Sequence, residues 1–124
     1  MALNKIEYFE TEAINDKEAK IVGMSLKGYE VANAVFTSVE FPKLDARGHK
    51  IVEIADEAFI YCELIHEIDG WGLIEKIGDR AFQESTIRRI PKDFGTVKSV
   101  GVRAFYGTGI ENKEIKYNDE AVEI

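Results

Sequence analysis

The sequence predicts an α/β solenoid, a short right-handed curved stack of repeated units with parallel strands on its concave side and a β-rich N-terminal cap. Two observations predict this fold class. An Ala-Phe pair recurs at a fixed interval through the C-terminal half, and the columns around the pair stay apolar. Self-similarity at a fixed period of roughly 20–50 residues is typical of stacked repeats.

The interval is defined by the segments IADEAFIYC, IGDRAFQES and VGVRAFYGT, whose phenylalanines lie 23 residues apart. It divides this half of the chain into units 51–73, 74–96 and 97–119, followed by a tail, 120–124. One such unit cannot bury its own apolar side, but stacked units cover one another. We therefore expect ladders of buried core side chains formed by Phe59, Phe82, Phe105, Ile54, Ile77 and Val100.

Each Ala-Phe pair is expected to lie in a bend. Asp56 and Asp79 precede the first two pairs, where a side-chain oxygen would cap a short helical turn. Val102 takes this position in the third unit, which predicts a looser turn there. A column of small residues should be buried and hydrogen-bonded to the backbone at the bend, and it consists of Cys62, Ser85 and Thr108.

A candidate strand follows each bend, namely ELIHEI (63–68), TIRRI (86–90) and GIENKEI (109–115). These segments are rich in β-branched residues and alternate in part between apolar and polar. Stacked in register, they would form a narrow parallel sheet. Its outward side chains would include Ile65, Glu67, Arg88, Arg89 and Glu111.

The phrase I-G-D-x-A-F-x-x-(C/S/T)-x-x-(L/I) resembles the BspA-type (bacterial surface antigen) leucine-rich repeats. IGDRAFQESTI is close to the core phrase of that family, and IADEAFIYCEL keeps its cysteine. The resemblance covers about residues 51–115. It implies strands on the concave side, irregular or short helical turns outside, and binding to proteins or surfaces. Many members of the family are secreted or lie on the cell surface.

The first half is less regular, and we expect it to complete a single domain over residues 1–124. KIEYFETEA and KEAKIVGMSL, separated by IND, predict a β-hairpin cap within residues 1–35. Residues 36–50 are a degenerate repeat and a loop. One register aligns Val31 and Phe36 with Ile54 and Phe59, whereas a second, which we favour, makes FTSVEFP a strand.

Composition excludes several classes of protein. The net charge is −7, and six of the seven excess negative charges fall in residues 51–124, so a nucleic-acid partner is not expected. The single cysteine excludes an internal disulfide. The charged N-terminus is unlike a signal peptide, and no stretch is apolar enough to span a membrane. We expect a cytoplasmic protein, or a secreted or surface protein if a signal peptide has been removed.

No residue pattern predicts catalysis, and we expect neither enzymatic activity nor a cofactor. His49, His66 and Cys62 lack the spacing of a zinc site, and Ser85 and Thr108 share the column of Cys62, which favours a structural cysteine. GVRAFYGTG lacks the Gly-Lys-Ser/Thr of a phosphate-binding loop.

We therefore expect a non-enzymatic module that binds another protein in a bacterium. Arg88 and Arg89 would pair with carboxylates of the partner, or else with Glu67 and Glu111 of the same sheet. Trp71, between two glycines, would be either an exposed hot spot or tucked against the stack. The candidate contact residues are His66, Trp71, Glu67, Arg88, Arg89 and Glu111. The alternatives are a phage or mobile-element inhibitor that mimics nucleic-acid charge, and a structural protein that assembles into homo-oligomers.

Overall fold

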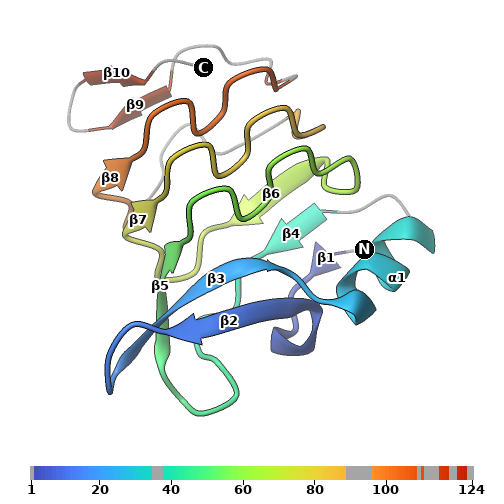
Figure 1. The fold of residues 1–124 in the computed structure, drawn as a ribbon, viewed down its shortest axis with the longest axis vertical. Coiled ribbons are helices and arrows are strands. Elements are labelled where there is room, and N and C mark those ends of the chain that lie inside the picture. Colours follow the sequence, from blue (N-terminus) through green and yellow to red (C-terminus); the bar gives the residue numbers. More distant parts are fainter. Residues whose placement is uncertain are drawn as a thin grey trace.

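The computed structural model describes residues 2–34, 38–88, 96–108, 110, 115–117 and 120–122 (Figure 1). In chain order its elements are β1 (Ala2–Leu3), η1 (a 3-10 turn, Ile6–Tyr8), β2 (Phe9–Ala13), β3 (Glu18–Met24), α1 (Leu26–Ala34), β4 (Ser38–Glu40), β5 (Lys50–Ile54), β6 (Glu67–Gly70), β7 (Lys76–Ile77), β8 (Ser99–Val100), β9 (Ile115–Tyr117) and β10 (Glu120–Val122).

The repeat period appears directly in the larger sheet, whose strand order is β2-β3-β5-β7-β8. Ile54 of β5 pairs with Ile77 of β7, and Ile77 pairs with Val100 of β8, all in parallel. Figure 1 shows these strands succeeding one another along the long axis of the molecule. The 23-residue interval is therefore the register of a parallel ladder, and the ladder lies at the apolar start of each unit.

A smaller parallel sheet, β1-β4-β6, lies on the other side of the core. Val39 of β4 pairs with Ile68 of β6. A strand at Ser38–Glu40 confirms the register that makes FTSVEFP a strand. The register that aligns Val31 with Ile54 is wrong, because Val31 lies in helix α1 and Ile54 lies in a strand.

The predicted strands after the bends are displaced or absent where the structure describes them. The first begins only at Glu67, since residues 63–66 are irregular, and residues 86–88 form no strand. Residues 86–88 are nevertheless bonded to the preceding unit, because the N–H of Arg88 donates to the carbonyl of His66 at 2.8 Å. The rest of the second segment, and most of the third, lie outside the described residues.

The predicted N-terminal hairpin is present. β2 and β3 pair antiparallel, and β3 also pairs in parallel with β5, so the hairpin adjoins the repeat ladder. Helix α1, which the sequence did not predict, starts after Ser25, whose hydroxyl accepts the N–H of Gly28 at 3.1 Å. The capping role of the hairpin, the domain limits, and the curvature and handedness of the stack stay predictions.

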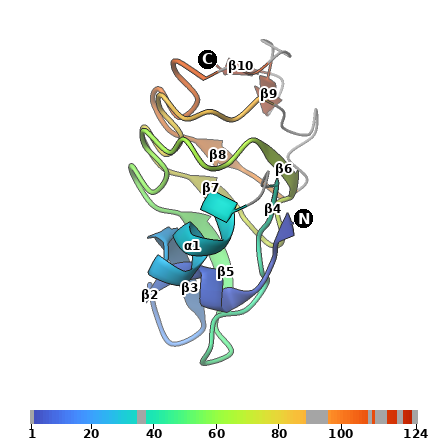
Figure 2. The same cartoon turned by 90° about the vertical axis from the view of Figure 1, so that its right-hand side faces the viewer.

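The bends are non-helical turns, and hydrogen bonds join each bend to the bend of the next unit. The prediction of short helical turns is therefore wrong. Glu57 and Tyr61 have left-handed φ angles of 59° and 55°, which interrupt any helix. The N–H of Phe59 donates to the carbonyl of Ala81 at 2.7 Å, and the N–H of Phe82 donates to the carbonyl of Ala104 at 2.8 Å. Figure 2 shows these turn segments stacked on one side of the molecule, with β4 and β6 on the other.

The core lies between the two sheets and the stacked turns, as the repeat columns predict. Phe82 stacks on Phe59 and on Phe105, with ring centroids 5.3 and 5.2 Å apart. Ile54 and Ile77 are fully buried, whereas Val100, on the outermost parallel strand described, is half-buried. No helix in the described part of the chain is long and apolar enough to cross a membrane.

The column of small residues behaves as expected in part. Cys62 and Ser85 are buried, and the hydroxyl of Thr108 donates to the carbonyl of Phe105 at 2.8 Å. The hydroxyl of Ser85 finds no hydrogen-bond partner within the described part of the chain. This column therefore fits the bend by its small size, and Thr108 and Cys62 also form hydrogen bonds with the backbone, Cys62 with that of Leu64 and Ile65.

Candidate functional site

The predicted contact residues do not form one exposed patch. Arg88 is exposed and forms no ion pair with any residue that the structure describes, while His66 and Glu67 are half-buried. Arg89 and Glu111 lie outside the described residues. Arg88 therefore does not pair with Glu67, whereas the pairs that involve Arg89 or Glu111 stay predictions.

Two side chains expected at the surface belong to the core. Ile65 is fully buried and is the core isoleucine of the first unit. The first unit has one more residue before Ile65 than the second unit has before its own core isoleucine, Ile87. A one-residue shift moves every side chain of an extended segment to the opposite face. Trp71 is only 6% exposed and packs against the rings of Phe41 and Phe82. The interpretation of Trp71 as an exposed hot spot is therefore wrong, and the tucked alternative holds.

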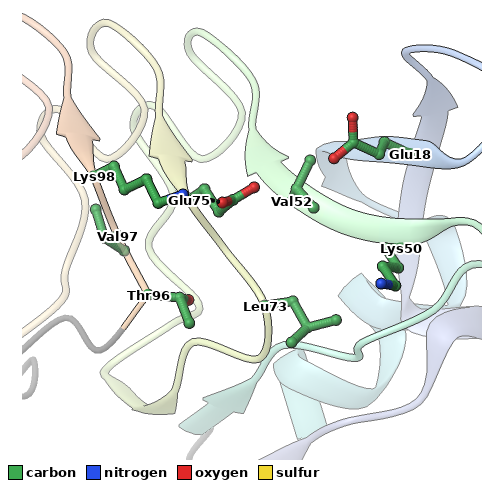
Figure 3. Close-up of a pocket in the computed structure, with 8 residues that line it drawn as sticks. All are labelled: Glu18, Lys50, Val52, Leu73, Glu75, Thr96, Val97 and Lys98. Atoms are coloured by element: carbon green, nitrogen blue, oxygen red, sulfur yellow. Dashed lines mark ion pairs between the residues drawn. The ribbon is translucent and has the colours of Figure 1, made fainter.

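A groove of about 570 Å³ crosses the larger sheet at the start of the repeat units (Figure 3). Two rows of residues spaced by the repeat period line it. One row consists of Val52, Glu75 and Lys98, and the other row consists of Lys50, Leu73 and Thr96. Glu18 of β3, which pairs with Lys50 in the sheet, lines the end of the groove. Val97 completes the lining between the rows.

The repeat register itself builds these rows. The N–H of Glu75 donates to the carbonyl of Val52, and the N–H of Lys98 donates to that of Glu75, both at 2.7 Å. Ile51 and Ile74, which precede Val52 and Glu75, are fully buried. Because successive residues of an extended chain point to opposite faces, burial of these isoleucines turns their neighbours outward. Each column that flanks the buried isoleucines thus becomes one wall of the groove.

Charges of both signs line the groove, and most of them have partners. The Glu75 carboxylate pairs with the Lys98 ammonium at 2.7 Å, and this hydrogen bond raises the pKa of Lys98 above its ordinary value. Glu18 accepts a hydrogen bond from the side-chain amide of Asn15 at 2.9 Å. Lys50 is exposed and has no ion pair with the described residues. An apolar floor of Val52, Leu73 and Val97 lies between these charges.

Of the groove residues, the sequence indicated only Val97, as a member of an apolar repeat column, and none was expected to contact a partner. A signal for them exists, because Lys50, Leu73 and Thr96 share one repeat column and Val52, Glu75 and Lys98 share another. Both columns flank the apolar column of Ile51, Ile74 and Val97. Their side chains vary between units, so a search for repeated residue types passes over them.

The candidate metal ligands and the cysteine do not come together among the described residues. No three His, Cys, Asp or Glu side chains in the described ranges are grouped to hold a metal ion. Burial raises the pKa of the Cys62 thiol, which opposes formation of a nucleophilic thiolate at neutral pH. His49 is engaged by Asp45, with 2.8 Å between Nδ1 and Oδ2. The groove offers apolar contact and charged groups to a ligand.

The family model described as BspA type leucine rich repeat region (6 copies) matches residues 3–111. The chain belongs to this family, as the repeated Ala-Phe phrase indicated. The match begins within the segment assigned to the hairpin, so the repeat region extends further toward the N-terminus than the three units recognised in the sequence. Comparison with curated proteins gave no match, and comparison with solved structures gave none either. Leucine-rich repeats generally serve protein–protein interaction.

Proposed function

We propose that this chain is a non-enzymatic module that binds another protein through the groove across its repeat units. One observation carries the proposal. The repeat register aligns side chains from successive units into two rows around an apolar floor, while the backbone beneath them is hydrogen-bonded from unit to unit. Such a surface binds without large rearrangement, which lowers the entropic cost of association.

The proposal is tested by capture of a partner from a lysate of the source organism, followed by reconstitution with both proteins purified. The groove variant is Lys50→Glu/Leu73→Ser. The matched control is Glu67→Lys/Arg88→Glu, which changes one residue of β6 and one residue outside the strands, both away from the groove. We expect the groove variant to weaken binding by titration calorimetry at least about tenfold, or about 1.4 kcal/mol. Equal affinity of the groove variant and the unmodified chain would overturn the assignment of the surface.

A second candidate is the inhibitor that mimics nucleic-acid charge, and the smaller sheet favours it. Glu40 and Asp69 are exposed on β4 and β6, and Glu67 is half-buried beside them. Binding through this acidic face would weaken steeply with added salt, because screening reduces attraction between surface charges. It would also respond to Glu40→Lys/Asp69→Lys, which reverses the exposed acidic charges of this face, and not to the groove variant, so these two variants separate the candidates.

A further inference from the structure

Lys50 is the one charged side chain lining the groove that the described structure leaves without a side-chain partner. The other three lining charges are Glu18, bonded to Asn15, and the Glu75–Lys98 pair. An exposed ammonium at the edge of an apolar floor costs little desolvation when a carboxylate approaches it. Lys50 is therefore the group best placed to select the charge of a ligand.

Two further lysines lie beside Lys50. The N–H of Lys50 donates to the carbonyl of Lys17, and the N–H of Ile51 donates to the carbonyl of Lys43, both at 2.9 Å. Lys17 and Lys43 are exposed, and neither forms an ion pair within the described part of the chain. Asp16 and Glu18 line the cavity at this corner together with Lys17 and Lys50, so the formal charges of that lining balance although the chain has a net charge of −7.

The apolar floor lies at a fixed distance from this corner. Lys50 and Leu73 are one unit apart in the ladder, and Val97 belongs to the next unit. Neighbouring strands of a sheet are about 4.8 Å apart, so the floor spans roughly 5–10 Å from Lys50. In an extended peptide, side chains two residues apart lie on one face about 6.8 Å from each other. If a carboxylate of the peptide binds Lys50, the peptide residue two positions away would thus lie over the apolar floor.

From these positions we infer that the groove takes an extended peptide segment with a carboxylate at Lys50 and an apolar side chain two residues away, over Val52, Leu73 and Val97. This inference rests on the proposed function and specifies its ligand. The carboxylate is that of an Asp or Glu side chain within the segment, which forms a charge-assisted hydrogen bond with the ammonium group. The inference excludes a basic peptide segment as the occupant of the groove.

The test selects random linear peptides against the full chain from two display libraries, one with peptides inside a carrier protein and one with free C-termini. We expect enrichment of the pattern acidic–any–apolar in the first library. Enrichment only in the second library, of an apolar residue two positions before the free C-terminus, would instead indicate a C-terminal carboxylate and would overturn the assignment to an acidic side chain. Enriched peptides are then synthesised, and their affinities are measured by fluorescence anisotropy.

Charge reversal then locates the contact. Lys50→Glu should weaken binding of the selected peptide about tenfold or more, and Lys5→Glu, the same change at an exposed site outside the groove, should change it less than about twofold. A peptide with Lys in place of its acidic residue should in turn bind Lys50→Glu better than it binds the unmodified chain. Circular dichroism checks that each variant is folded.

Three results would overturn the inference. They are peptides selected without an acidic group, equal binding by Lys50→Glu and Lys5→Glu, and no enrichment from either library. If the groove variant Lys50→Glu/Leu73→Ser still abolishes binding of a captured protein, the proposed function survives and only the ligand chemistry fails. If no protein or peptide binds at all, both fail together.

Discussion

Asp56 and Asp79 join neighbouring units instead of capping their own turns. Asp56 Oδ1 accepts the N–H of Asp79 at 2.8 Å, and Asp79 Oδ1 accepts the N–H of Val102 at 2.9 Å. The backbones of neighbouring units approach closely at this bridge, which explains why residue 101 is glycine. A Cβ at Gly101 would lie 2.5 Å from the backbone nitrogen of Asp79. A capping and a bridging aspartate occupy the same place in the sequence, so only the structure distinguishes them.

Replacement of Asp79 tests this bridge. Asp79→Ala should lower the free energy of unfolding by about 1 kcal/mol, because the N–H of Val102 loses its acceptor. Asp79→Asn is the matched control and should lose less, since its side-chain carbonyl can accept the same hydrogen bond. Urea unfolding followed by circular dichroism measures both, and equal losses would indicate that the hydrogen bond is not what matters.

Phe82 should be the most sensitive aromatic residue, because it stacks on a ring in each neighbouring unit. Phe82→Ala should cost about 3–5 kcal/mol of unfolding free energy, through lost transfer energy and the cavity left behind. Tyr61, whose side chain is 65% exposed, is the control, and Tyr61→Ala should stay within about 0.5 kcal/mol. A loss at Phe82 no larger than that at Tyr61 would contradict the stacked ladder.

At the scale of elements, the sequence predicted the hairpin and the strand in FTSVEFP, but it misplaced the principal ladder. Strands β7 and β8 are two residues long, too short for an alternating pattern to reveal. Their extended conformation depends on hydrogen bonds to the units on either side, which are 23 residues away. Local propensity contains no information on such bonds. The groove escaped prediction for the same reason, since its walls exist only when units stack.

The loop between β4 and β5 depends on one buried carboxylate. Burial raises the pKa of Asp45, but the hydrogen bonds it accepts from the His49 ring and from the backbone N–H groups of His49 and Arg47 outweigh burial and lower the pKa below its ordinary value. A lowered folded-state pKa means stability that is fully present above the ordinary aspartate value of about 3.9 and is lost as pH falls through the folded pKa.

Asp45→Asn should therefore be less stable than the unmodified chain at pH 6, and the difference should shrink as the pH falls below about 4. Denaturant unfolding across this range measures the difference. Asp16→Asn, which changes an exposed carboxylate in another loop, is the control. Its difference in stability from the unmodified chain should depend little on pH. A constant difference at every pH would show that the ionised form of Asp45 contributes nothing specific.

For the whole molecule, the 23-residue period predicted a parallel stack with a shared aromatic core, and the structure and the family match agree. The first half was harder to predict, because Ile21 and Ile54 pair in the same ladder although 33 residues separate them. The extra length accommodates helix α1, and no equally spaced phrase marks the unit. A repeat that changes length loses its signal in sequence while keeping its place in the sheet.

Deletion of one complete unit tests the stack as a whole. Removal of residues 74–96 should leave a folded protein of lower stability, because unit 97–119 can then stack on unit 51–73 in the same register. Removal of residues 74–93, which breaks the period by three residues, should prevent cooperative folding. Thermal unfolding followed by circular dichroism compares the two, and equal behaviour would contradict modular stacking.

The most direct test of the binding groove is amide hydrogen exchange of the chain with and without its captured partner. Binding through the groove predicts slower exchange at residues 50–52, 73–75 and 96–98, the segments that line it in three successive units. Exchange at β4 and β6 should change little. Protection confined to β4 and β6, with the three groove segments unaffected, would contradict the account.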